Sequence, residues 1–177
     1  MQTHPQLIIP TRFGKVDEAS FDPRAFIDAD IQFDSRDVAK LWNLQADVAV
    51  GLYPMKRVDC QLAAWVDGRM LDLKDCPKEP FAVDYAGTGF MMIDRTVLER
   101  FQAAYPERWH DEGPVGPCFA YFDPRVENFG KRDSGKDDRV YLSEDYSFCK
   151  DFRRIGGKIL ADPGIALVHH GTYAYRA

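Results

Sequence analysis

The sequence of 177 residues has 45% hydrophobic and 13% aromatic side chains, enough to build a folded core and too many for a disordered chain. This length indicates one domain. The formal net charge of −5 argues against general affinity for nucleic acid or an anionic membrane. A local basic patch could still bind a phosphate-bearing ligand.

The cysteines and the hydropathy both indicate a cytoplasmic protein. Cys60, Cys76, Cys118 and Cys149 are scattered and form no CxxC pair, which predicts reduced thiols rather than a disulfide framework or a zinc site. No apolar run reaches the roughly 20 residues of a transmembrane helix. Residues 2–13 are interrupted too often by polar residues and prolines for a signal peptide.

Apolar runs and capping residues predict the elements of the first third of the chain. In order, these are a short strand at 7–9 within the N-terminal segment 1–20, a buried strand at 24–27, a helix capped by Asp34 or Ser35, and a buried strand at 47–53. Pro54 ends the last strand because proline has no amide hydrogen for the sheet.

Turn residues and helical spacing predict the remaining elements. In order, these are a hairpin of 61–66 and 69–73, strands at 81–85 and 90–93, a helix capped by Asp94, loops at 106–117 and 129–139, a helix over 144–155 capped by Ser143, and strands at 158–161 and 165–168. Asp67-Gly68 suits a type I′ turn, in which both central residues need positive φ. This alternation predicts an α/β fold with a mixed central sheet flanked by helices.

Two carboxylates, Asp28 and Asp30, follow the strand predicted at 24–27. Carboxylates gathered without a counter-ion repel each other, so a fold that gathers them usually does so around a cation or shared protons. Carboxylates with open water positions suit Mg²⁺ or Mn²⁺, which also bind phosphate oxygens. A solvated turn, with Asp28 accepting from local amides, is the alternative interpretation.

Glu144 and Asp145 lie in the first turn of the helix predicted over 144–155. The helix dipole favours negative charge there, so capping explains one carboxylate well and two less well. The functional interpretation makes one of them a general base that accepts the proton of an attacking hydroxyl. The dipole would keep that carboxylate ionised.

His169 and His170 follow the last predicted strand. Neighbouring side chains of a strand point to opposite faces, so one of the two can face a given site. A lone histidine is more often structural than a ligand. Beside the acidic pairs, it can complete an oxygen and nitrogen ligand set that manganese accepts.

Gly87-Thr88-Gly89 permits close approach of the backbone to a ligand, although an ordinary tight turn explains it equally. The sequence contains no GxGxxG or GxxxxGK[ST] phosphate loop. This argues against Rossmann dehydrogenases and P-loop enzymes.

Four stretches of the chain resemble the GT-A-fold glycosyltransferases, the nucleotide-diphospho-sugar transferases of the family 2-like kind. They are, in this order, FIDADIQFDSRDV with LYPMK, YAGTGFMMIDRTVLERF, YLSEDYSFCKDFRRIGGKI and ADPGIALVHHG. Together they cover most of residues 21–177, which the resemblance makes a GT-A-like core. It implies a hexosyltransferase-like enzyme with a nucleoside diphosphate sugar as donor and a hydroxyl-bearing saccharide, lipid or protein as acceptor.

The resemblance implies a donor-binding role for two of the motifs. Asp28 and Asp30 match the DxD motif that holds a divalent metal, Mn²⁺ or Mg²⁺, and the diphosphate of the donor. Gly87, Thr88 and Gly89 match the turn that lines the pocket for donor sugar and acceptor.

The other two motifs would supply the base and complete the metal site. Glu144 and Asp145 match the acidic pair, in which Asp145 would be the base of an inverting enzyme. His169 matches the late histidine that often joins the metal, and His170 would be its neighbour without that role.

Members of this family normally begin with a strand-helix-strand unit that binds the nucleoside. About twenty residues precede the strand predicted at 24–27, fewer than the roughly 30 that such a unit needs, so we expect a GT-A domain truncated at its N-terminus. A second hypothesis is a catalytically silent relic that acts as a binding or assembly module, with an exposed N-terminal sheet edge open to an oligomer partner. A metal-dependent phosphohydrolase has less sequence support.

Overall fold

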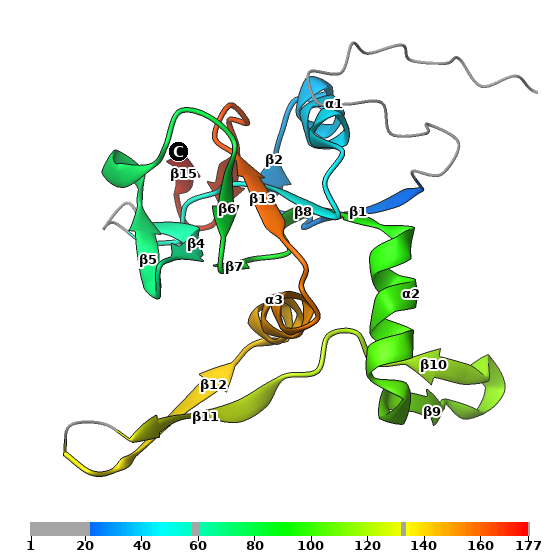
Figure 1. Cartoon of the computed structure of the whole chain (residues 1–177). Helices are drawn as coiled ribbons and strands as arrows, with labels where there is room; N and C mark the ends of the chain where they lie inside the picture. Colours follow the sequence, from blue (N-terminus) through cyan, green and yellow to red (C-terminus); the bar gives the residue numbers. More distant parts are fainter. Residues whose placement is uncertain (1–21, 58–60, 132–133, 177) are drawn as a thin grey trace, which may run out of the picture.

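The computed structural model describes residues 22–57, 61–131 and 134–176. Its central element is a five-stranded mixed sheet with the strand order β1–β8–β3–β13–β6 (Figure 1). These strands are β1 (Pro23–Ile27), β3 (Val48–Gly51), β6 (Phe81–Val83), β8 (Phe90–Asp94) and β13 (Ile159–Asp162). β3 and β13 are parallel, and the other neighbouring pairs are antiparallel.

Helices cover both faces of this sheet. α1 (Ser35–Leu44) packs on one face against β3, β8 and β13, whereas α2 (Arg95–Ala104) and α3 (Glu144–Arg154) lie on the other side (Figure 1). The prediction of a mixed α/β fold with helices around a central sheet is therefore confirmed at this level. In the described part of the chain, no helix is long and apolar enough to cross a membrane.

The two central strands β3 and β8 are buried along their whole length, as their continuous apolar runs predict. Successive side chains of β3 enter different apolar clusters. Val48 and Val50 pack in the cluster that contains Phe101 of α2, and Ala49 packs in the cluster that contains Leu41 of α1. The sheet thus separates two cores, one under each helical layer.

Smaller sheets surround the central one. β15, β14 and β2 form one three-stranded sheet, and β5, β4 and β7 form another. Two hairpins, β9/β10 and β11/β12, stand apart from the central sheet (Figure 1). The bounds are β2 (Ile31–Gln32), β4 (Gln61–Val66), β5 (Arg69–Asp72), β7 (Tyr85–Ala86), β9 (Trp109–Asp111), β10 (Pro117–Phe119), β11 (Arg125–Lys131), β12 (Asp137–Leu142), β14 (Val168–His170) and β15 (Ala174–Arg176), with short 3₁₀ helices η1 (Leu73–Asp75), η2 (Pro106–Arg108) and η3 (Gly113–Val115).

Local signals in the sequence identified the helix caps and one turn correctly. Asp34 caps α1, and its side chain accepts the amide of Arg36. Asp94 caps α2 in the same way. The turn between β4 and β5 has φ of 50° at Asp67 and 74° at Gly68, as the predicted type I′ hairpin requires.

Other predictions differ from the structure. The two predicted loops overlap the hairpins β9/β10 and β11/β12, whose strands are largely exposed and so lack an alternating apolar pattern. β1 is a strand but is not buried, because it pairs with β8 alone and forms an edge of the sheet. The strand predicted at 81–85 divides between β6 and β7, which belong to different sheets.

The strand predicted at 165–168 begins later in the structure. β14 begins at Val168, and the residues before it, Ile165 and Leu167, are buried in a loop rather than in a strand. The strand predicted at 7–9 lies outside the described residues. Cys76, Cys118 and Cys149 are free thiols, and Cys60 also lies outside the described residues.

A buried charge network joins α3 to the segments that follow α2. The Asp151 carboxylate of α3 is 1% exposed and lies 2.5 Å from Arg108 and 2.6 Å from Arg125. Arg154 approaches the same carboxylate at 3.4 Å. Glu127 of β11 also pairs with Arg125, at 2.8 Å. These contacts hold β11 and the 3₁₀ helix η2 against α3.

The substitution Asp151→Asn tests this network. Removing the buried charge takes the carboxylate partner from the enclosed Arg108 guanidinium and leaves Arg125 with Glu127 alone, so we expect a loss of about 3–5 kcal/mol in the free energy of unfolding, measured in urea. Glu99→Gln is the control because the Arg95–Glu99 pair is exposed on both sides, and it should cost less than about 1 kcal/mol. Equal effects of the two substitutions would contradict the role given to Asp151.

Candidate functional site

Backbone hydrogen bonds join three of the polar clusters found in the sequence. Residues 28–31 form a turn that the Ile31 amide closes by donating to the Asp28 carbonyl at 3.0 Å. The Asp28 amide donates to the Gly89 carbonyl at 3.0 Å, and the His170 amide donates to the Asp30 carbonyl at 2.8 Å. The DxD turn therefore lies between the glycine segment before β8 and the histidines of β14.

Asp30 and His169 face each other across this junction. His169 Nε2 is 3.7 Å from Asp30 Oδ2. Its other ring nitrogen, Nδ1, lies 2.8 Å from the Pro54 carbonyl, which can only accept, so Nδ1 carries the proton. In a neutral imidazole this leaves the Nε2 lone pair directed to the side of the carboxylate. Two electron-pair donors at this distance repel each other unless a cation lies between or beside them.

Lys56 supplies such a cation in this structure. Its ammonium donates to Asp30 Oδ2 at 2.5 Å, the same oxygen that His169 approaches. This hydrogen bond is the largest cause of the lowered pKa of Asp30. Lys56 is therefore a member of the site.

The third predicted metal ligand, Asp28, is exposed on the turn. Within residues 22–57, 61–131 and 134–176, no group of three or more His, Cys, Asp or Glu side chains is arranged to hold a metal ion. The pair formed by Asp30 and His169 nevertheless suits a divalent ion, because bonds of about 2.0–2.2 Å to each can span their separation. Water and phosphate oxygens complete the coordination of Mg²⁺ at such two-ligand sites.

His170 lies on the opposite side of β14, as the alternation of a strand predicts. Its Nε2 is 2.8 Å from the side-chain oxygen of Gln32 on β2. His169, by contrast, is 14% exposed and faces the carboxylate. The structure thus assigns the two histidines different environments.

Asp145 occupies the first turn of α3, with Glu144 exposed beside it. Its Oδ1 accepts from the Ser143 hydroxyl and, at 2.8 Å, from the Tyr146 amide. Ser143 thus stands at the predicted cap position but directs its hydroxyl to Asp145 rather than to the helix amides. Burial raises the pKa of Asp145, and the charge of Glu144 adds to this. The sequence predicted that the helix dipole keeps this carboxylate ionised, whereas burial favours its protonated form.

Tyr53 connects these groups and was missed in the sequence. It is 8% exposed, and its hydroxyl accepts from the Gly89 amide at 3.1 Å. The ring packs edge-on against His169, with centroids 5.2 Å apart. Burial raises its pKa, and the charges of Asp145 and Asp28 raise it further.

Packing against Tyr53, without any ligand, explains why positions 87 and 89 are glycines. A Cβ atom on Gly89 would lie 2.8 Å from the Tyr53 hydroxyl, and one on Gly87 would overlap it. Thr88, between them, is half-buried. The close approach that these glycines allow is therefore made by Tyr53, which closes this side of the site.

The missed residues carried a positional signal. Tyr53 and Lys56 follow the carboxyl end of β3, and ligands of open α/β sheets bind beyond the carboxyl ends of strands. Neither residue belongs to a cluster of like side chains. The search for paired carboxylates and histidines therefore passed over both.

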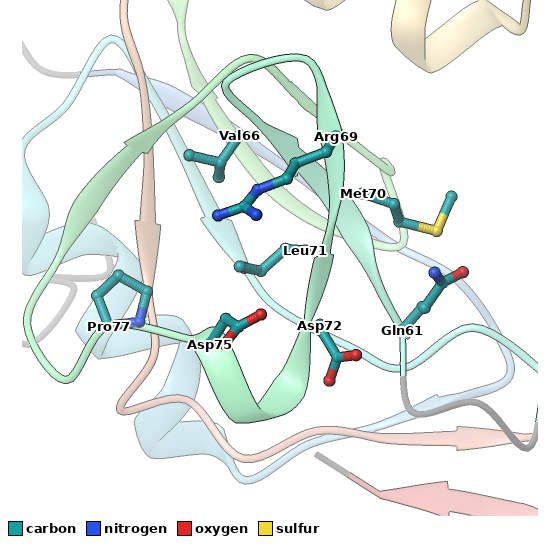
Figure 2. Close-up of a pocket in the computed structure, with 8 residues that line it drawn as sticks. All are labelled: Gln61, Val66, Arg69, Met70, Leu71, Asp72, Asp75 and Pro77. Atoms are coloured by element: carbon teal, nitrogen blue, oxygen red, sulfur yellow. The ribbon is translucent and has the colours of Figure 1, made fainter.

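A pocket of about 270 Å³ lies elsewhere, on the β4–β5 hairpin and η1 (Figure 2). Figure 2 shows the Arg69 guanidinium toward one end of it, above Leu71, and the carboxylates of Asp72 and Asp75 toward the other. Its lining residues include none of the predicted site residues. The polar junction around Asp30 is thus separate from this pocket.

Comparison with known proteins adds little to this description. No family model and no curated protein matches the chain. One solved structure, "Crystal Structure of A197 from STIV", is similar with 20% identity and a TM-score of 0.43, over 85% of this chain. The match spans 58% of that chain. A likeness of this strength carries no argument about fold or function.

The pair of substitutions Gly87→Ala and Tyr53→Phe tests the packing of the glycine segment. Gly87→Ala should cost about 1–3 kcal/mol in the free energy of unfolding, because the new methyl group displaces the Tyr53 hydroxyl. Adding Tyr53→Phe removes that oxygen and leaves the ring carbon 3.1 Å away, so the double variant should be more stable than Gly87→Ala alone. Costs that simply add would show that the two side chains do not compete for this space.

Proposed function

We propose that this protein is a metal-dependent glycosyltransferase that moves a sugar from a nucleoside diphosphate sugar to a hydroxyl acceptor. The observation that carries the proposal is the meeting of Asp30 and His169 beside Tyr53, three residues that come from distant parts of the sequence. The order of the four sequence stretches that resemble GT-A glycosyltransferases supports the same assignment. A mixed sheet with helices on both faces is consistent with a GT-A-like core.

The donor side of the proposed site is the DxD turn. Asp30 and His169 would hold Mn²⁺ or Mg²⁺, with Asp28 on the exposed side of the turn toward the donor. The ion, when bound, neutralises charge that builds up on the leaving diphosphate. Because the Pro54 carbonyl holds Nδ1 of His169, the ring is already oriented with Nε2 available.

The acceptor side is the first turn of α3. Asp145 would accept the proton of the acceptor hydroxyl while that oxygen bonds to the anomeric carbon and the bond from this carbon to the diphosphate breaks. A carboxylate with a raised pKa is a stronger base, so the burial of Asp145 favours this role. The bonds from Ser143 and Tyr146 to Oδ1 leave Oδ2 to receive the proton.

Asp145→Asn tests the base. Asparagine keeps the oxygen that accepts from Ser143 and Tyr146, so the fold should persist while the turnover of sugar transfer falls at least about 100-fold. The measurement is release of nucleoside diphosphate in the presence of Mn²⁺ and acceptor, with Glu144→Gln as the matched control. Undiminished turnover in Asp145→Asn would remove this residue from the mechanism.

The raised pKa of Asp145 also predicts how this substitution affects stability. Because the folded state binds the Asp145 proton more tightly than the unfolded state, ionisation of Asp145 destabilises the fold at neutral pH. Asp145→Asn should therefore be at least as stable as the wild type at pH 7. The difference should close as the pH falls through the raised pKa toward the ordinary 3.8, as urea unfolding at several pH values will show. A stability difference that does not change with pH would contradict this assignment.

A catalytically silent binding module is the second candidate, and two observations favour it. Lys56 already neutralises Asp30 without a metal, and β1 forms an edge of the central sheet that can accept another strand. Isothermal calorimetry with Mn²⁺ and a panel of nucleoside diphosphate sugars separates the two candidates. The enzyme should release or absorb heat with at least one sugar nucleotide, whereas the module should give none.

A further inference from the structure

The unexpected feature of the proposed donor site is that a lysine occupies the position where the charge of a metal ion is needed. Lys56 Nζ and His169 Nε2 approach the same oxygen of Asp30, at 2.5 Å and 3.7 Å. An ammonium and a divalent ion cannot both sit on this oxygen, because they repel each other at such distances. Occupation of Asp30 by one cation therefore excludes the other.

We propose that Lys56 is an internal counter-ion that a divalent cation must displace from Asp30, and that the displaced ammonium then binds the phosphate groups of the ligand. This inference rests on the proposed function for the identity of the anionic ligand, a nucleoside diphosphate. Its first half, the competition for Asp30, concerns the protein and the metal alone.

The surroundings of Lys56 allow this exchange without unfolding. The side chains of Lys56 and Asp30 are 41% and 42% exposed, so water and ions reach the pair. The Lys56 stem lies along the backbone at Gly171, where a Cβ atom would be 3.1 Å from its Cδ. A flexible four-carbon stem over a glycine can swing while its base stays in place. Exposed ion pairs of this kind are weak enough for a divalent ion to replace.

Displacement leaves the ammonium beside the metal and facing solvent. A phosphate group bound to the ion would bring negative oxygens to the place where Lys56 needs a new partner, and lysine binds phosphate as a point charge. His169 holds its position meanwhile, because its bond to the Pro54 carbonyl does not involve Lys56. Lys56 should thus oppose metal binding when the nucleotide is absent and support nucleotide binding when the metal is present.

The variant Lys56→Met tests both effects, because methionine retains an unbranched stem without the charge. The first measurement is the dissociation constant of Mn²⁺ alone, from the electron paramagnetic resonance signal of the free ion. Lys56→Met should bind Mn²⁺ about fivefold tighter or more than the wild type, as expected when a competing exposed ion pair is lost. The second is calorimetric titration of uridine diphosphate at saturating Mn²⁺, in which the variant should bind about fivefold more weakly.

Matched variants separate this account from a general change in charge or fold. Lys74→Met removes the same charge from the exposed Lys74–Asp72 pair of the β5 end and should alter neither constant. Asp30→Asn should lose the tight Mn²⁺ binding, also when combined with Lys56→Met. Lys56→Gln replaces Lys56→Met if circular dichroism shows that the methionine variant is unfolded.

The opposite signs of the two effects are decisive, because a merely structural lysine would weaken both bindings together. An Mn²⁺ dissociation constant that Lys56→Met leaves within twofold or weakens would overturn the competition, as would failure of both proteins to bind Mn²⁺. Unchanged or tighter binding of the nucleoside diphosphate would overturn the phosphate role. Tighter Mn²⁺ binding in a protein that transfers no sugar would support the competition and remove the glycosyltransferase assignment instead.

Discussion

Two backbone hydrogen bonds determine where the acidic turn lies relative to the glycine segment and the histidines of β14. They run from the Asp28 amide to the Gly89 carbonyl and from the His170 amide to the Asp30 carbonyl. Backbone amides and carbonyls that are removed from water need hydrogen-bond partners. These two bonds therefore hold the acidic turn between two other segments independently of its side chains. Asp30 and His169 meet because their main chains are joined.

The electrostatics of the site follow from where water is excluded. At the exposed turn, the Lys56 ammonium balances the charge of Asp30 and lowers the pKa of its carboxyl group. At the more enclosed turn of α3, burial raises the pKa of Asp145 against the hydrogen bonds that it accepts. In the proposed function, these two carboxylates have different tasks, one to bind a cation and the other to accept a proton. Tyr53 leaves positions 87 and 89 of the glycine segment no room for side chains.

The sequence predicted those parts of the structure that local physics decides. The caps at Asp34 and Asp94, the turn at Asp67 and the buried strand β3 depend on neighbouring residues, and all four are as predicted. The exposed hairpins and the edge position of β1 depend on which segments pack nearby, and the hydrophobic periodicity of the sequence does not indicate this. The Asp30–His169 junction was predicted because both follow apolar strands. Lys56 and Tyr53 were not, since a single lysine or tyrosine carries no pattern.

The central claim is that Asp30 and His169 bind one divalent cation, and that this cation displaces Lys56 from Asp30. Anomalous diffraction at the manganese edge, from crystals soaked with manganese chloride and uridine diphosphate, tests it most directly. The account predicts a single strong peak within bonding distance of Asp30 Oδ2 and His169 Nε2, with the Lys56 ammonium moved onto a phosphate oxygen. A manganese peak elsewhere, or an intact Lys56–Asp30 pair with no peak beside it, would contradict the account.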